Sequence, residues 1–254
     1  MGVLSDIMAQ KASELAALRR LALPAPPPLR PVQLRRELNA GRLSLISEIK
    51  RRSPSAGALS TRLSVAERAA AYERAGASML SILCDSHFFD GSYEHLREAR
   101  AATRLPLLCK EFVVDEVQLD VARAFGADAV LLIVRCLSAE RTLELVRAAR
   151  ERELVPFVEV ATEDELAVAL SAGADLVGVN ARDLDTLQMD AGRAARVLAA
   201  IPASLVRVHL SGLSGAADVL RIKSSGADAA LVGEALMRAD DPEPLLRSLA
   251  SAAG

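Results

Sequence analysis

A short tripeptide that recurs four times constrains the fold of this chain more than any other sequence feature. Each copy begins with Gly-Ala, follows an alanine-rich helical pattern and precedes a short apolar run. The copies are Gly76-Ala77-Ser78, Gly126-Ala127-Asp128, Gly173-Ala174-Asp175 and Gly226-Ala227-Asp228. Glycine there suits the left-handed residue that ends a helix. The glycines lie about 50 residues apart, so each interval holds two strand-helix units and the repeat predicts eight strands.

Apolar runs of strand length alternate with longer stretches of helical periodicity, which favours a parallel α/β architecture. The predicted strands are Leu43 to Ile49, Met79 to Leu83, Leu107 to Phe112, Val130 to Val134, Val155 to Val160, Leu176 to Val179, Leu205 to Leu210 and Ala229 to Val232. A closed (β/α)8 TIM barrel fits eight such units better than an open doubly wound sheet, which spacing alone does not exclude. A nucleotide-binding open sheet is disfavoured because no G-x-G-x-x-G motif follows the first strand.

The chain has the length of one barrel domain. Its 254 residues are 51 % hydrophobic, so we expect a single domain over residues 1–254, with the barrel at 43–254. Residues 1–42 are interpreted as an N-terminal helical extension and connector. In this extension Leu4 to Leu21 predicts an amphipathic helix with Ile7, Leu15 and Leu18 on one side, and a proline-rich connector runs from Pro24 to Pro31. We expect the extension to pack on the barrel or cover its mouth.

Composition excludes several classes of partner. The 31 basic and 33 acidic residues give a formal charge of −2, and no run of like charge would attract nucleic acid. The apolar stretches are too short for a bilayer span and no signal pattern opens the chain, so we expect a cytoplasmic protein without a membrane partner. Three cysteines without C-x-x-C pairing are expected to be buried reduced thiols, and the three histidines lack neighbours at metal-ligand spacing.

Polar residues at predicted strand ends are the first candidates for chemistry, because TIM-barrel active sites lie at the carboxyl ends of the strands. Such residues are Glu48, Lys50, Lys110, Glu111, Glu159, Asn180 and Arg182. Any one of them could be ordinary solvated strand-end charge. Only four of the 31 basic residues are lysine, however, and two of these follow predicted strands. Lysine can release a proton and arginine effectively cannot, so this usage indicates proton transfer or compact charge pairing.

Two glycine-containing pairs late in the chain suggest a phosphate site. Ser211-Gly212 and Gly233-Glu234 follow the predicted seventh and eighth strands, where barrels commonly hold phosphate with backbone N–H groups and a helix N-terminus. Either pair alone is a weak motif that more often forms an ordinary turn. Together, opposite Lys50, they favour a phosphorylated ligand.

Six segments, in order along the chain, carry a resemblance to one known family. They are Glu48-Ile49-Lys50-Arg51-Arg52-Ser53-Pro54-Ser55, Phe88 to Ser92, Cys109 to Gln118, Val158 to Val160, Gly178 to Leu184 and Leu231 to Met237. Together they resemble the sequence blocks of indole-3-glycerol phosphate synthases. This resemblance implies a TIM barrel that converts 1-(2-carboxyphenylamino)-1-deoxyribulose 5-phosphate to indole-3-glycerol phosphate, with loss of CO2 and water, in tryptophan biosynthesis. It implies no metal and no organic cofactor.

The resemblance also implies roles for individual residues. Lys110 would be the general acid at the sugar-derived carbonyl, and Lys50 would pair with the substrate's carboxylate or phosphate and donate a proton later. Glu159 would be the general base as water leaves, Glu48 would keep the lysines charged and oriented, and Asn180 would bind the sugar and anilino region. Further substrate-binding residues would be Ser53, Phe89, Phe112, Leu131, Arg182, Leu184, Leu210, Ser211, Gly212, Gly233 and Glu234. Of these, Phe89, Phe112, Leu131 and Leu184 would hold the aromatic ring.

Elementary electrostatics adds two expectations about the lysines and glutamates of the site. Each lysine should lower the pKa of the carboxylate beside it, and a crowded ammonium should lose its proton more easily.

Four positions depart from the family pattern. Leu210 replaces a glutamate, Glu111 an aspartate, Ala181 a second asparagine, and Ala56 a frequent lysine. Leu210 matters most because it removes a carboxylate expected in the site. It keeps two alternatives open, a related barrel acting on another anilino or phosphosugar substrate and a catalytically silent phosphosugar binder. We expect a monomer, with a dimer as the alternative.

Overall fold

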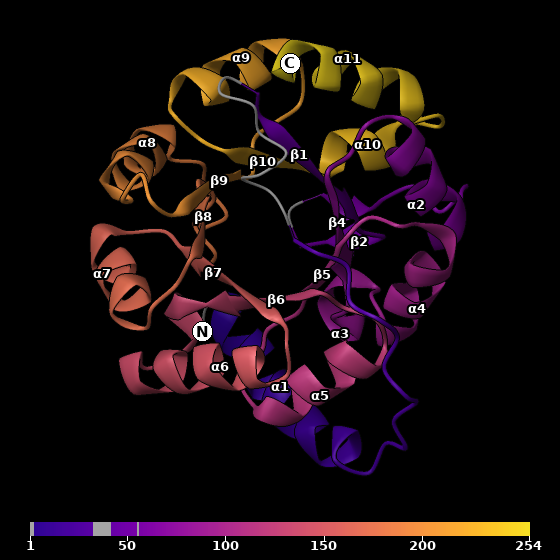
Figure 1. The fold of residues 1–254 in the computed structure, drawn as a ribbon, viewed down its shortest axis with the longest axis vertical. Coiled ribbons are helices and arrows are strands. Elements are labelled where there is room, and N and C mark those ends of the chain that lie inside the picture. Colours follow the sequence, from indigo (N-terminus) through magenta and orange to yellow (C-terminus); the bar gives the residue numbers. More distant parts are fainter. Residues whose placement is uncertain (1–2, 33–41, 55) are drawn as a thin grey trace.

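Eight parallel strands close into a barrel in the computed structural model, which describes residues 3–32, 42–54 and 56–254 (Figure 1). Around the barrel the order is β1-β10-β9-β8-β7-β6-β5-β4, so each strand pairs with its neighbours in the chain and β10 closes onto β1. The strands are β1 Ser44–Ile49, β4 Met79–Leu83, β5 Leu107–Lys110, β6 Ala129–Ile133, β7 Val155–Val160, β8 Leu176–Asn180, β9 Val206–Leu210 and β10 Ala229–Val232. The predicted TIM barrel is confirmed.

Three strands have the predicted bounds and the other five differ by one or two residues. The largest difference is at β5, which ends at Lys110 and not at Phe112. The backbone N–H of Phe112 donates to the Glu111 carboxylate at 2.7 Å, so it is not available to extend the sheet. The strand β6 ends at Ile133 because Val134 begins a short 3-10 helix, η1 Val134–Cys136.

Helices surround the barrel (Figure 1). They are α1 Val3–Leu18, α2 Val65–Arg74, α3 Ser86–Phe89, α4 Tyr93–Ala102, α5 Glu116–Ala124, α6 Ala139–Glu151, α7 Glu163–Ser171, α8 Ala191–Ala200, α9 Ala216–Ser224, α10 Glu234–Arg238 and α11 Glu243–Ala253. The four repeat glycines follow α2, α5, α7 and α9 with φ between 78° and 103°. This left-handed conformation at the helix ends confirms the prediction made from the repeat.

The apolar core has two layers. One fills the barrel, with Ile46, Leu108 and Phe157 among its buried side chains. The other lies between strands and helices and includes Tyr72 and Leu132. Alternation along each strand divides residues between these layers. Each strand is therefore packed on both faces, and its carboxyl end lies at one mouth of the barrel.

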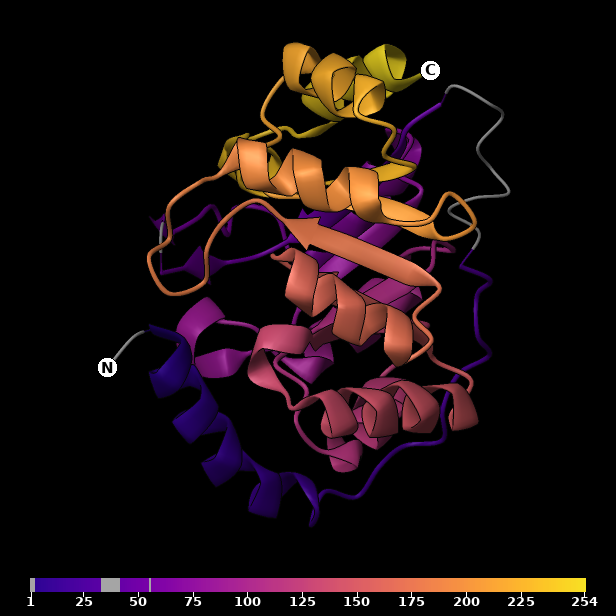
Figure 2. The same cartoon turned by 90° about the vertical axis from the view of Figure 1, so that its left-hand side faces the viewer.

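The N-terminal helix lies beside that mouth. Figure 2 shows β8 pointing toward the end of the molecule where α1 begins. Leu4 and Ile7 of α1 are buried, while Leu15 and Leu18 are only half-buried. The helix ends at Leu18, three residues before the predicted end. Residues 33–41, in the last part of the predicted extension over residues 1–42, lie outside the described residues.

The loop after β1 contains a small hairpin that the sequence did not predict, with β2 Arg52–Ser53 antiparallel to β3 Gly57–Ala58. Ser55, in the motif after the first strand, lies outside the described residues. Of the three cysteines, Cys84 and Cys109 are buried, whereas Cys136 is only half-buried because it sits on η1 at the barrel rim. None of the helices in the described part of the chain is both long and apolar enough to cross a membrane.

Candidate active site

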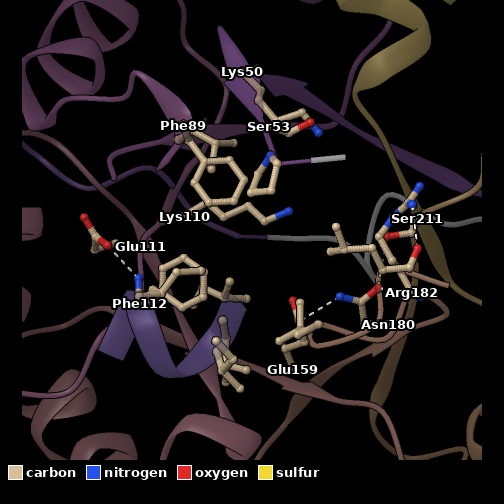
Figure 3. A pocket seen from close by; sticks show the side chains of 18 residues that line it. Lys50, Ser53, Phe89, Lys110, Glu111, Phe112, Glu159, Asn180, Arg182 and Ser211 are labelled. Atoms are coloured by element: carbon tan, nitrogen blue, oxygen red, sulfur yellow. Dashed lines mark hydrogen bonds between the residues drawn. The ribbon is translucent and has the colours of Figure 1, made fainter. Parts of the chain in front are cut away.

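Parallel strands bring their carboxyl ends to one mouth, and a pocket opens there (Figure 3). It encloses about 800 Å³ of space, its open entrance included. Eleven of the predicted site residues line it: Lys50, Ser53, Phe89, Lys110, Phe112, Leu131, Glu159, Asn180, Arg182, Leu184 and Ser211. A concave, largely apolar pocket with a few converging charged groups is the usual form of a small-molecule site.

Glu48 joins the two strand-end lysines. One carboxylate oxygen, Oε2, lies 2.6 Å from Nζ of Lys110, and the other, Oε1, lies 3.0 Å from Nζ of Lys50. Glu48 is buried on β1, while the lysine side chains remain 25 % and 16 % exposed toward the pocket. The buried carboxylate therefore sits behind two ammonium groups that face the cavity.

This pairing shifts the pKa values of Glu48 and Lys110. Burial alone would raise the pKa of Glu48, but Lys110 and Lys50 outweigh it and lower that pKa from 4.5 to about 2. Burial alone would lower the pKa of Lys110, but Glu48 and then Glu159 raise it above its usual value. The expectation that crowding eases loss of the lysine proton is wrong for Lys110, because its close neighbours are anions.

A second polar chain runs along the opposite wall from β7 to β9. The amide of Asn180 donates to Glu159 Oε1 at 2.8 Å, and its Oδ1 accepts from the Ser211 hydroxyl at 3.0 Å and from the Arg182 backbone N–H at 2.9 Å (Figure 3). The three bonds fix which end of the Asn180 amide faces Glu159. Ser211 has a φ of 72°, a left-handed turn that directs it back toward this chain.

Glu159 differs electrostatically from Glu48. Its pKa is raised, because burial outweighs the lowering effects of Lys110 and of the Asn180 hydrogen bond, and Glu48 adds repulsion. The expected lowering of carboxylate pKa values by the lysines is therefore present at both glutamates, but it prevails over burial only at Glu48. One pocket therefore contains a carboxylate that stays ionised and another that can exchange a proton nearer neutrality.

An aromatic wall closes the remaining side. The rings of Phe89, from α3, and Phe112, after β5, lie with centroids 6.1 Å apart at an interplanar angle of 37°. Leu131 from β6 and Leu184 from the loop after β8 add aliphatic surface to the same pocket. The polar and apolar walls face each other across the cavity (Figure 3).

Five predicted site residues do not line the pocket: Glu48, Leu210, Gly212, Gly233 and Glu234. Glu48 lies behind Lys50 and Lys110, which line the pocket. Gly233 lies directly behind Glu48, because a Cβ built on it would come 2.7 Å from Glu48 Oε1. Gly212 follows β9 in a left-handed turn, and Glu234 begins α10 and pairs with Arg238.

Leu210, the principal departure from the family pattern, is buried within the barrel. It pairs in register with Asn180 of β8 and belongs to the apolar cluster that fills the barrel. Its Cδ1 would lie 2.8 Å from a Cβ placed on Gly178. A leucine side chain therefore occupies the level of the site at which the resemblance places a carboxylate.

Six pocket residues were not predicted from the sequence: Leu4, Ile7, Pro54, Leu83, Ile133 and Leu187. Glu111, expected only as a strand-end candidate, also lines the pocket. Leu4 and Ile7 belong to α1, more than 40 residues before Lys50 in the chain. The scarcity of lysine was the available signal for this helix, because Lys11 of α1 is buried against carboxylates of the barrel mouth. Within the described ranges, no group of three or more His, Cys, Asp or Glu residues could hold a metal ion.

Comparisons with known proteins agree on the family. The family model for indole-3-glycerol phosphate synthase matches residues 4–249. Indole-3-glycerol phosphate synthases of Mycobacterium avium and Mycobacterium tuberculosis are each 41 % identical to this chain over 252 residues, covering 99 % of it and 92 % of the relative. A crystal structure of 3-hexulose-6-phosphate synthase superposes with a TM-score of 0.66 at 19 % identity, over 84 % of this chain and all of that one. This last similarity shows the fold alone.

Proposed function

The chain belongs to the indole-3-glycerol phosphate synthase family, and from this premise we propose how its residues carry out the family's carboxy-lyase reaction. The observation that carries the proposal is the pairing of Lys110 with Glu48 on one wall of the pocket and the bonding of Glu159 to Asn180 on the other. An acid and a base that line one cavity match a reaction that must first protonate an oxygen and then remove a proton.

Lys110 acts first, as the general acid. The aromatic carbon that bears the carboxylate attacks the sugar-derived carbonyl carbon, and Lys110 protonates the carbonyl oxygen as the new C–C bond forms. The C–C bond to the carboxylate then breaks, and CO2 leaves with the aromatic system restored. Because Glu48 and Glu159 raise the pKa of Lys110, this acid is fully protonated at neutral pH.

Glu159 acts in the second stage, as the general base. The former carbonyl oxygen leaves as water once it is protonated a second time, with Lys50 as the donor beside it. Glu159 removes the ring proton whose loss forms the indole double bond. Its raised pKa makes it a stronger base than an ordinary surface carboxylate.

The remaining walls bind the substrate. Phe89, Phe112, Leu131 and Leu184 hold the anthranilate ring, and Asn180 with Ser211 holds the sugar hydroxyls. We place the phosphate at the backbone of Gly212, Gly233 and Glu234, which follow the adjacent strands β9 and β10. Ser53 and Arg182 line the pocket and offer further hydrogen bonds to the substrate. We further infer that the enzyme acts as a cytoplasmic monomer on this small phosphorylated substrate.

The stoichiometry of the products tests this proposal. Purified protein supplied with 1-(2-carboxyphenylamino)-1-deoxyribulose 5-phosphate should release one CO2 for each indole formed, without added metal or cofactor. Release of CO2 without indole would contradict the assigned ring closure. Tight binding of the substrate with neither product would instead favour a silent binder.

A further inference from the structure

The helical spacing of residues on α1 places the buried cation Lys11 next to two apolar residues that line the pocket. Leu4, Ile7 and Lys11 are three and four residues apart and therefore share one face of the helix. Leu4 and Ile7 line the pocket, whereas Lys11 is only 1 % exposed and does not reach it. Any effect of Lys11 on the pocket must therefore pass through its neighbours.

Those neighbours are carboxylates from two different barrel loops. Nζ of Lys11 lies 2.7 Å from Oδ2 of Asp85, after β4, and 3.0 Å from Oε1 of Glu111, after β5. It also lies 2.8 Å from Glu14 of its own helix. Asp85 and Glu111 are nearly inaccessible to solvent, while Glu14 is 26 % exposed. We refer to Lys11, Asp85 and Glu111 as the clamp.

Each clamp carboxylate also accepts hydrogen bonds from a segment that carries one of the two phenylalanines of the aromatic wall. We call the space that Phe89 and Phe112 line the slot. Oδ1 of Asp85 accepts the backbone N–H groups of Phe88 at 2.6 Å and Phe89 at 3.2 Å and so caps α3. Oε1 of Glu111 accepts the backbone N–H of Phe112 at 2.7 Å. The two segments that these carboxylates hold carry Phe89 and Phe112, whose ring centroids lie 6.1 Å apart. Lys11 thus lies at the junction of α1 with both phenylalanine-bearing segments.

We propose that Lys11 is a positioning residue that, through Asp85 and Glu111, sets the width of the slot for the substrate's aromatic ring. The inference rests on the proposed function and adds a residue to it. A compact ammonium with three donors fits three converging carboxylate oxygens, whereas a planar guanidinium needs more room. This requirement explains why position 11 carries one of only four lysines among the 31 basic residues of the chain. Burial raises the pKa of Glu111 to about 7, with Asp85 adding repulsion and Lys11 opposing both. The clamp therefore holds one cation against two buried carboxyl groups.

The first test is a split between KM and kcat. Lys11→Met should raise KM about tenfold and leave kcat within about threefold, because slot contacts bind substrate and transition state alike. Binding of indole-3-glycerol phosphate, followed by indole fluorescence, should weaken by a similar factor; the chain has no tryptophan to interfere. Glu14→Gln is the matched control, since Glu14 contacts Lys11 but neither barrel loop, and it should change KM less than twofold.

A double variant separates positioning from charge balance. Lys11→Met leaves buried carboxylates unpaired, which can unfold the protein, whereas Lys11→Met with Glu111→Gln removes one negative charge with the positive one. The double variant should fold and keep the raised KM. Wild-type KM and product affinity in either folded variant would overturn the proposal. An inactive wild-type protein that also fails to bind the product would instead remove the function on which the proposal rests.

Discussion

Oε2 of Glu48 lies 2.6 Å from Nζ of Lys110, in a contact that buries the carboxylate and leaves the ammonium facing the pocket. The pair fixes the charge of both members, because the pKa of Glu48 falls to about 2 and that of Lys110 rises. An acid held in this way is charged and oriented before substrate arrives, so its electrostatic effect needs no reorganisation during the reaction.

Removing the charge of Glu48 should shift the pH dependence of catalysis. In Glu48→Gln the pKa of Lys110 should fall, because burial then acts with less opposition from an anion. The alkaline limb of kcat/KM should move to lower pH by about one unit, with kcat/KM at neutral pH reduced roughly 100-fold. The measurement is a pH profile of indole formation. An alkaline limb at its wild-type position would show that Glu48 does not control the acid.

Position 233 should need a glycine, because a side chain there would push Glu48 away from Lys110. A Cβ there would meet Oε1 of Glu48 at 2.7 Å, so Gly233→Ala should displace the carboxylate and lower kcat by about tenfold or more. Gly215→Ala is the matched control, since a Cβ at Gly215 has no neighbour within 4 Å. Steady-state kinetics of the two variants decides the point. Equal activities would mean that Glu48 tolerates displacement.

Glu111 should make stability depend on pH. Burial raises its pKa in the folded protein from 4.5 to about 7. A folded-state pKa above the unfolded value stabilises the protein below pH 4.5, and this contribution is lost as pH rises through 7. Urea unfolding at pH 4.5 and 7.5 should therefore show that the stability difference between wild type and Glu111→Gln changes by about 3 kcal/mol. A difference that is the same at both pH values would contradict the raised pKa.

Leu210 offers a test of the principal departure. Leu210→Glu restores the carboxylate that the family pattern has at this level, beside Asn180, and should raise turnover of the anilino-sugar substrate, at a cost in stability because the position is 3 % exposed. Leu210→Gln, with the same shape and no charge, should not raise it. Parallel measurements of kcat and thermal stability are needed. Equal or lower turnover in Leu210→Glu would show that the site has adapted around leucine.

The barrel could be predicted from sequence because its signals are local. A helix-ending glycine and an apolar run lie within a few residues of each other, and Gly76, Gly126, Gly173 and Gly226 repeat that signal. Convergence of Lys50, Lys110, Glu159 and Asn180 then followed from parallel strand topology. The prediction of a strand end was less accurate where a side chain binds a backbone group that would otherwise extend the sheet, as the Glu111 carboxylate does with the N–H of Phe112.

Features that depend on distant packing could not be predicted. The clamp joins Lys11 to Asp85 and Glu111 across intervals of 74 and 100 residues, and nothing in the local pattern of α1 specifies its partners. The raised pKa of Lys110 likewise depends on Glu159 as well as Glu48. The sign of a pKa shift follows from which charges lie closest in three dimensions, and sequence spacing does not give those distances.

Indole fluorescence after addition of 1-(2-carboxyphenylamino)-1-deoxyribulose 5-phosphate follows ring closure by Lys110 without interference, because the chain contains no tryptophan. We predict a rising signal with the wild-type protein and with Lys223→Ala, whose lysine bonds only to the backbone oxygen of Gly254 in the described structure. In Lys110→Ala the rate should fall at least about 1,000-fold with the fold intact. No signal from the wild type would contradict ring closure by this protein, and an undiminished signal from Lys110→Ala would contradict the role of Lys110 as the general acid.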